Sequence, residues 1–130
     1  MEIDVLHQQG KVPVTVFKIK GPVTDNEELE RIASQAIDDG SRHIVLDLSE
    51  VPYMATSGLR AIHTIYDRLR QASPDSAEDP TGRGIAAGTY LSPHLKLVKP
   101  TPHVLEVLRA AGYDMFLEIH KDLNLAIASF

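Results

Sequence analysis

Residues 43–59 read HIVLDLSEVPYMATSGL, and the fold class follows from them. The first part, residues 43–48, is short and mostly apolar, which is typical of a strand buried on both faces of a parallel sheet. Residues 50–57 then predict a loop that leads into a helix. Loops that follow parallel strands are where α/β proteins usually carry their functional groups. This stretch therefore predicts both an α/β fold and the position of a candidate site.

The helix that follows this loop has its apolar residues at helical spacing on one face: Leu59, Ile62, Ile65, Tyr66 and Leu69. Thr56 or Ser57 is expected to be its N-cap, because a hydroxyl at that position can accept a hydrogen bond from a free backbone N–H. Gly58 either allows a close backbone approach at the turn or relieves crowding at the helix start.

Upstream, residues 2–7 and residues 13–20 alternate between apolar and polar side chains, which predicts an antiparallel hairpin. Thr24 and Glu27 have the spacing of a capping box, so we expect a helix to start at Thr24. Gly40 is expected to end that helix in a left-handed conformation.

Downstream, residues 94–98 predict another strand. A helix should follow, with Thr101 as its cap and Gly112 at its end. Residues 115–119 predict a last short strand, and Asp122 is expected to cap a short final helix.

Between these halves, residues 72–93 are rich in Ser, Pro, Gly, Ala and Asp and predict a long flexible loop. The predicted order is β-β-α-β-α-loop-β-α-β-α. Strands that alternate with helices indicate a largely parallel sheet with crossover helices. We therefore expect one α/β domain over residues 1–130, with a mostly parallel mixed sheet of four to five strands.

Composition excludes several classes of function. The net charge of −5 argues against non-specific nucleic-acid binding, which needs clustered cations. No apolar run has the ~20 residues of a membrane-spanning helix, so direct membrane insertion is not expected. The chain has no cysteine, which excludes disulfides and fits the cytoplasm. The six histidines lack the spacing of a helical zinc site, and we expect no metal and no cofactor.

Residues 44–59 resemble the signature of the STAS domain family, an apolar strand ending in Asp-Leu-Ser and then a turn of the D-S-S-G-L kind. Residues 17–23 are similar to the family's second strand and glycine turn. Residues 97–104 and 108–113 are similar to its last crossover and helix. The resemblance covers nearly the whole chain except residues 72–93, and it supports the fold predicted above.

The resemblance implies an anti-sigma factor antagonist. Such a protein binds an anti-sigma factor, which is also a serine/threonine kinase of the histidine-kinase-like ATPase class. The hydroxyl residue after the signature aspartate is phosphorylated in this family, and the matching position here is Thr56, with Ser57 as second choice. Ala55 replaces that aspartate, and Thr56 replaces the commoner serine. The expected partner-binding residues form one run: Tyr53, Met54, Ala55, Thr56, Ser57, Gly58, Leu59 and Arg60.

Alternatives stay open at several points. Of Tyr53 and Met54, one should pack into the core and the other should be exposed to a partner. Asp47 lies near the site or bonds the backbone at the strand end. The chain could instead be a phosphorylation-independent scaffold, or an accessory subunit of a signalling or transport complex, and a homodimer is left open. A small serine hydrolase that pairs Ser57 or Thr56 with His63 is the least favoured hypothesis, and we expect no enzyme.

Overall fold

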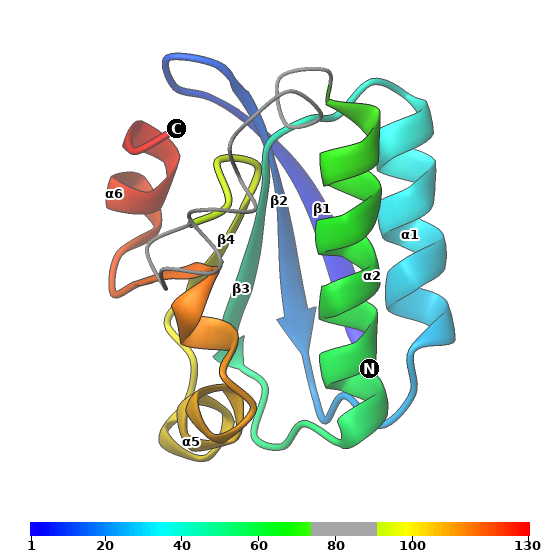
Figure 1. The fold of residues 1–130 in the computed structure, drawn as a ribbon, viewed down its shortest axis with the longest axis vertical. Helices are drawn as coiled ribbons and strands as arrows, with labels where there is room; N and C mark the ends of the chain where they lie inside the picture. The colour runs from blue at the N-terminus through cyan, green and yellow to red at the C-terminus, as the bar shows by residue number, and fades with distance from the viewer. Residues whose placement is uncertain (74–90) are drawn as a thin grey trace.

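The computed structural model describes residues 1–73 and 91–130, which form a five-stranded sheet with helices on both faces (Figure 1). In chain order the elements are β1 (Glu2–Gln9), β2 (Pro13–Lys20), α1 (Glu27–Asp38), β3 (Ile44–Glu50), α2 (Thr56–Ala72), β4 (Leu95–Val98), α5 (Pro102–Ala110), the 3-10 turn η1 (Tyr113–Met115), β5 (Glu118–His120) and α6 (Leu123–Ala128). The predicted α/β class is confirmed. Most of the loop predicted at residues 72–93 lies outside the described residues.

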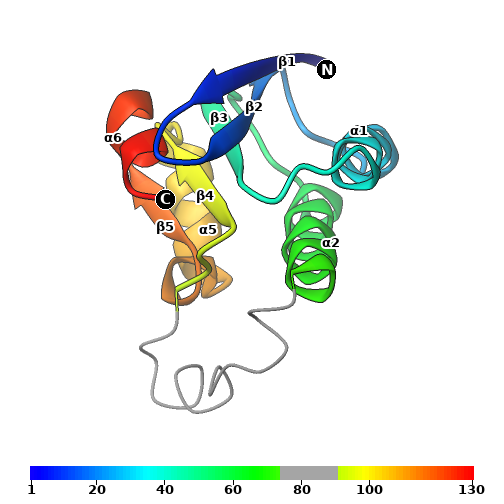
Figure 2. The same cartoon turned by 90° about the horizontal axis from the view of Figure 1, so that it is seen from above.

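The strand order is β1-β2-β3-β4-β5, with β1 antiparallel to β2 and the other neighbours parallel. The predicted hairpin and the mostly parallel sheet are therefore confirmed. Each crossover steps one strand further in the same direction. Because such connections are right-handed, α1, α2 and α5 all come to lie on one face of the sheet. The last helix, α6, covers the opposite face (Figure 2).

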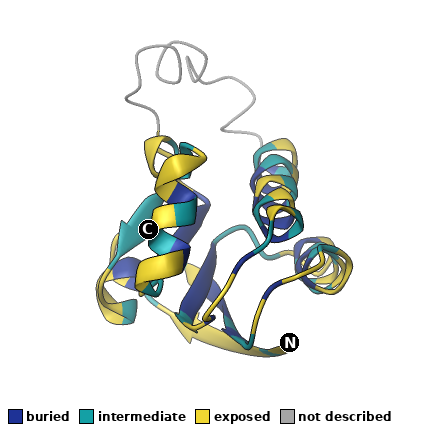
Figure 3. Ribbon diagram, turned by 90° about the horizontal axis from the view of Figure 1, so that it is seen from below, coloured by how far each residue is buried: buried dark blue, intermediate teal, exposed yellow. Residues whose placement is uncertain are grey.

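The main core lies between the sheet and the three crossover helices. A smaller apolar cluster lies under α6, where Ala126 and Ile127 pack against Val14, Val45 and Val98. Strand β3 contributes to both clusters and is buried from Ile44 to Leu48, as its continuous apolar run predicts. In contrast, β1 is exposed along most of its length at the edge of the sheet (Figure 3).

The start of α1 differs from the prediction. The helix begins at Glu27, its N-cap is Asn26, and Thr24 lies in the preceding loop, so the capping box from Thr24 to Glu27 is wrong. Asp25 Oδ1 instead accepts a hydrogen bond from the backbone N–H of Glu27 at 3.0 Å. Gly40 follows the C-cap residue of α1 and is left-handed as predicted, with a φ of 108° that a glycine adopts without strain.

The later elements follow the prediction with two differences. Thr101 is the N-cap residue of α5, but its hydroxyl makes no cap hydrogen bond. The last strand begins only at Glu118, because η1 occupies Tyr113–Met115. Gly112 is left-handed with a φ of 80°, as expected. Asp122 caps α6 by accepting a hydrogen bond from the N–H of Leu125 at 3.0 Å.

Candidate functional site

The candidate site is the turn that joins the C-terminal end of β3 to α2. Val23, in the loop after β2, forms an isolated parallel bridge with Met54. The Val23 N–H donates to the Tyr53 carbonyl at 2.9 Å, and the Ala55 N–H donates to the Val23 carbonyl at 2.9 Å. The loops after two neighbouring strands are thereby joined through their backbones, which fixes where α2 begins.

The two hydroxyls of the turn have different surroundings. The N-cap of α2 is Ala55, so Thr56 and Ser57 are its first two helical residues, and the prediction that either one caps the helix is wrong. Ser57 Oγ donates to the carbonyl of Thr24 at 2.8 Å. Thr56 is exposed, and its hydroxyl makes no hydrogen bond to residues 1–73 or 91–130. Thr56 is therefore the hydroxyl that an incoming group can reach.

The structure also separates the two residues at the entrance of the turn. Met54 is buried with 2% of its surface exposed, whereas Tyr53 is 48% exposed. The Tyr53 ring stacks on the ring of His103 in α5, with centroids 5.5 Å apart and planes 19° apart. Tyr53 thus belongs to the surface, and Met54 supports the turn from beneath.

Gly58 is a packing requirement of the turn. A Cβ added at this position would lie 2.7 Å from Met54 Cγ and 2.8 Å from Val23 Cγ1. Both neighbours are buried and have little room to move. The close approach of α2 to the Val23 loop therefore needs a residue without a side chain.

Two further contacts hold the turn against neighbouring elements. Thr101 Oγ1, at the start of α5, donates to the carbonyl of Val51 at 2.7 Å. The Tyr113 hydroxyl donates to the carbonyl of Leu59 at 2.8 Å, and partial burial raises the pKa of this tyrosine. Leu59 is partly buried and Arg60 is exposed. All the residues expected to bind a partner are therefore close together, but only some of them lie on the surface.

Sequence reasoning missed Thr24, Thr101, His103 and Tyr113 as parts of this site. One signal could have indicated the threonines, because both follow a parallel strand. The carboxyl ends of parallel strands meet at one edge of a sheet, so the loops that follow them are neighbours. No local pattern indicates the stacking of His103 or the reach of the Tyr113 hydroxyl.

The Ser–His pair considered for a hydrolase is not formed. His63 Nδ1 lies 3.3 Å from Asp67 Oδ2, one turn further along α2, and its ring contacts Tyr66 and Phe116. The Ser57 hydroxyl donates to the backbone carbonyl of Thr24. These two side chains therefore do not make a nucleophile and base.

Asp47 bonds the backbone instead of joining the site. It is 5% exposed, and its Oδ1 accepts a hydrogen bond from the N–H of Ser49 at 3.0 Å. Within the described residues, no three His, Asp or Glu side chains gather closely enough to hold a metal ion. None of the described helices is long and apolar enough to cross a membrane.

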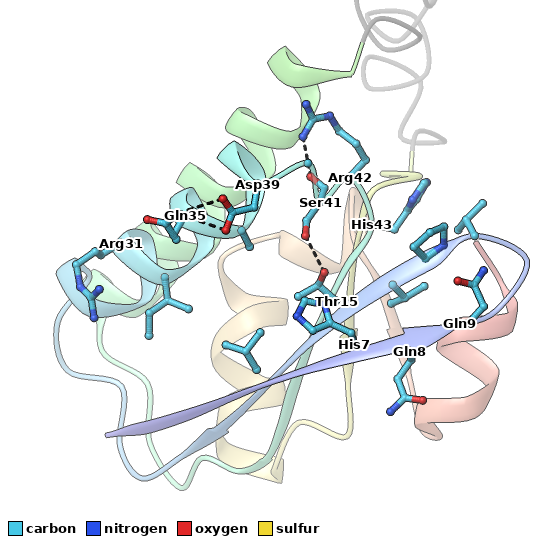
Figure 4. A pocket seen from close by; sticks show the side chains of 17 residues that line it. His7, Gln8, Gln9, Thr15, Arg31, Gln35, Asp39, Ser41, Arg42 and His43 are labelled. Carbon is cyan, nitrogen blue, oxygen red and sulfur yellow. Dashed lines mark hydrogen bonds between the residues drawn. The ribbon is translucent and has the colours of Figure 1, made fainter.

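A hollow of about 750 Å³ lies at the opposite end of β3, between α1 and the β1–β2 hairpin (Figure 4). Several of its polar side chains bond one another. Thr15 Oγ1 lies 2.8 Å from Ser41 Oγ, and Gln35 donates to Asp39 at 3.3 Å. Arg42 donates to two backbone carbonyls. Because these groups are already paired, we assign no ligand to this hollow.

Comparison with known proteins agrees with this geometry. Residues 4–75, more than half of the chain, match the STAS domain family. The chain is 27% identical over 104 residues to BtrV of Bordetella bronchiseptica, a protein named for a proposed role as an anti-sigma factor antagonist; the match covers 80% of this chain and 73% of BtrV.

Two solved structures share the fold at lower identity. An anti-sigma factor antagonist from Mycobacterium paratuberculosis has a TM-score of 0.71 and 18% identity, over 98% of this chain and 93% of that one. The Bacillus cell fate determinant SpoIIAA in its phosphorylated form has a TM-score of 0.62 and 16% identity, over 97% of this chain and 96% of that one. Together with the family match, these likenesses show that the chain belongs to the STAS domain family and is similar to its anti-sigma factor antagonists.

Proposed function

We propose that this chain is a regulatory protein that binds an anti-sigma factor, and that phosphorylation of Thr56 weakens the complex. The partner is a serine/threonine kinase of the histidine-kinase-like ATPase class. One observation carries the proposal: Thr56 is the exposed hydroxyl at the first residue of α2, while the neighbouring Ser57 hydroxyl is held by the Thr24 carbonyl. Phosphorylation from ATP is consistent with a cytoplasmic place of action.

The proposed contact surface is smaller than the run of residues expected from the sequence. Tyr53, Thr56 and Arg60 are exposed, and Ala55, Ser57 and Leu59 are partly exposed. The half-exposed Tyr53 ring, fixed by its stacking on His103, is a suitable anchor for a partner, because aromatic side chains contribute strongly to interfaces. The buried Met54 and Gly58 keep this surface in shape.

A phosphate on Thr56 would add about −1.5 to −2 charges at pH 7 to the first turn of α2. The free N–H groups of that turn attract an anion, and no acidic residue of the first turn opposes it. Arg60 lies four residues further on, one helical turn away, where it can pair with the phosphate. A partner that fits a neutral hydroxyl would then meet a charged group and an occupied arginine.

Affinity purification of the tagged chain from its source cell, followed by intact-mass measurement, tests the partner and the phosphate together. We expect a kinase-like ATPase to co-purify with the unphosphorylated chain. Thr56→Val should lose the phosphate and keep the partner. Ser57→Ala is the matched control, and it should keep the phosphate. Phosphate on Ser57, or none after incubation with the purified partner and ATP, would contradict the switch.

A second candidate is a partner whose binding does not depend on phosphorylation, and Ala55 favours it. An alanine leaves the turn without the carboxylate that the family carries beside the reacting hydroxyl. Thr56→Glu distinguishes the two functions. If the complex is lost, the switch is supported, and if the complex is unchanged, the chain acts as a constitutive scaffold.

A further inference from the structure

A second cavity, of about 630 Å³, lies between α5 and β5, and we call it the α5–β5 cavity. None of residues 53–60 lines it, so it is separate from the proposed partner surface. Its apolar lining includes Leu105 on α5 and Leu117 and Ile119 around the start of β5. The volume falls in the range of about 300–1,000 Å³ that is typical of small-molecule sites.

Three cationic side chains from three elements line the α5–β5 cavity. Lys99 follows β4, Arg109 lies on α5 and Lys121 follows β5. None of these side chains forms an ion pair or hydrogen bond with another described residue, which sets this cavity apart from the hollow beside α1. The chain as a whole has a net charge of −5, so this local group of cations has the opposite sign to the overall charge.

Acidic groups do not neutralise these cations. Asp114 is one carboxylate in the lining. The other is Glu118, and its Oε2 lies 2.7 Å from the buried ammonium of Lys96, which cancels its charge. Lys99, Arg109 and Lys121 together with Asp114 therefore leave two positive charges in excess. This excess would balance the charge of a phosphomonoester dianion, which is about −1.5 to −2 at pH 7.

The backbone at Lys99 gives an independent observation. Its φ is 51°, and among the described residues it is the only one other than glycine with a positive φ. A lysine is strained in this region, whereas a glycine adopts it freely. The Lys99 N–H donates to the His120 carbonyl at 2.9 Å, which holds the residue at the end of β4. Strain that the surrounding structure maintains is characteristic of functional positions.

We infer that the α5–β5 cavity binds a small phosphomonoester that carries an apolar body. The guanidinium of Arg109 can bind two phosphate oxygens side by side, and Lys99 and Lys121 add point charges. The apolar body then covers the partly exposed side chains of Leu105 and Ile119. This binding does not depend on the partner or on phosphorylation of Thr56, so either proposal can fail without the other.

The experiment is a titration of the ¹⁵N-labelled full chain with phenyl phosphate, followed by NMR. We expect chemical-shift changes confined to residues around the α5–β5 cavity, and none with neutral phenol at the same concentration. Arg109→Gln and Lys121→Gln should each weaken binding on the order of threefold to tenfold, because each removes one partly hydrated charge contact. Lys11→Gln, at an exposed lysine of the β1–β2 turn, is the matched control and should bind as the unmodified chain does.

Lys99→Gly tests the strained lysine separately from folding. Glycine fits the positive φ, so the melting temperature should not fall, while the affinity for phenyl phosphate should decrease. Chemical-shift changes spread evenly over all basic residues would overturn the inference. So would an affinity for phenyl phosphate that is the same in all three cavity variants as in the unmodified chain. Vesicles containing phosphatidic acid identify the source of the ligand. A chain whose cavity takes a lipid headgroup should bind these vesicles, whereas a chain whose cavity takes a free metabolite should not. Binding of a phosphopeptide without any binding of phenyl phosphate or these vesicles would also overturn it.

Discussion

Ala55 occupies the N-cap of α2 with φ −81° and ψ 170°, the extended geometry from which an Asp or Ser side chain caps a helix. Alanine has no acceptor to offer, so the first turn of α2 is uncapped by any side chain. We expect Ala55→Asp to raise the free energy of unfolding by about 1 kcal/mol, measured by urea denaturation. Ala55→Asn should give much of the same gain without the charge. A loss of stability in both variants would contradict this account.

At Gly58, two effects of an alanine substitution oppose each other. Helix propensity favours alanine by about 1 kcal/mol. The added Cβ, however, would lie 2.7 Å from Met54 Cγ and 2.8 Å from Val23 Cγ1, and overpacking of this kind costs about 1–3 kcal/mol. We therefore expect Gly58→Ala to destabilise the fold in urea denaturation. Combining it with Met54→Ala should cost less than the sum of the two single changes, and additive losses would argue against the clash.

Among the elements, β4, β5 and α6 meet at one buried charge. Lys96 on β4 has a side chain that is only 3% exposed, and its Nζ lies 2.7 Å from Glu118 Oε2 and 2.8 Å from Ser129 Oγ. Its ammonium also lies 4.8 Å from the centre of the Phe130 ring. This side chain therefore ties the last strand and the end of the last helix to the sheet.

The two halves of this ion pair should respond differently to substitution. Glu118→Gln leaves the ammonium buried without a counter-charge, and we expect a loss of about 1–3 kcal/mol, reduced from the cost in a fully buried pair because Glu118 is 32% exposed. Lys96→Met keeps an apolar chain in place and leaves a carboxylate that water can reach, so it should cost less. Urea denaturation of both variants tests this order. A larger loss of unfolding free energy for Lys96→Met than for Glu118→Gln would contradict the prediction.

The starts of the helices were the features that the sequence predicted least well. The hydroxyls of Ser57 and Thr101 both have the local setting of a cap, yet each donates to a carbonyl in another loop, at Thr24 and Val51. These partners are 33 and 50 residues away in the chain. A local pattern shows that a hydroxyl is available but not which distant carbonyl competes for it. For the same reason, the local pattern alone could not show that the Ser57 hydroxyl is held by a distant carbonyl; the preference for Thr56 came only from the family resemblance.

At the scale of the whole molecule, the pH dependence of stability should carry a contribution from His43. Burial, together with the nearby His94 and Lys96, lowers the pKa of His43 below its ordinary value of 6.5. The unfolded chain therefore binds a proton that the folded chain resists. This stabilising contribution is present above about pH 6.5 and is lost as the pH falls through the lowered pKa.

His43→Gln removes the titrating group and provides the measurement. As the pH falls below about 6.5, the melting temperature of the unmodified chain should fall relative to that of this variant. The carboxylates titrate in both proteins and largely cancel in the comparison. A difference that does not change with pH would show that His43 keeps its ordinary pKa.

The topology of the molecule could be predicted further than its site. Period-two alternation located β1 and β2, although β1 is mostly exposed and β2 is buried on both faces. Helical spacing located α2, because its apolar residues all lie on the buried face of that helix. The turn could be located from its place after β3. Alternation could not decide between Tyr53 and Met54, since the isolated bridge to Val23 that orients them depends on a loop 31 residues away. No sequence pattern indicated the α5–β5 cavity, because its cationic side chains come from three separate segments of the chain.

The joined loops at the C-terminal edge of the sheet have a kinetic consequence. The Val23–Met54 bridge, the Ser57 and Thr101 hydroxyls and the Tyr53–His103 stack all restrain the surface around Thr56 before any encounter. A binding protein then avoids much of the roughly 0.5–1.5 kcal/mol that immobilising each flexible interface side chain costs. Association should therefore be a single step whose observed rate rises linearly with concentration in stopped-flow mixing, and a plateau at high concentration would reveal a slow rearrangement of this edge or of its partner.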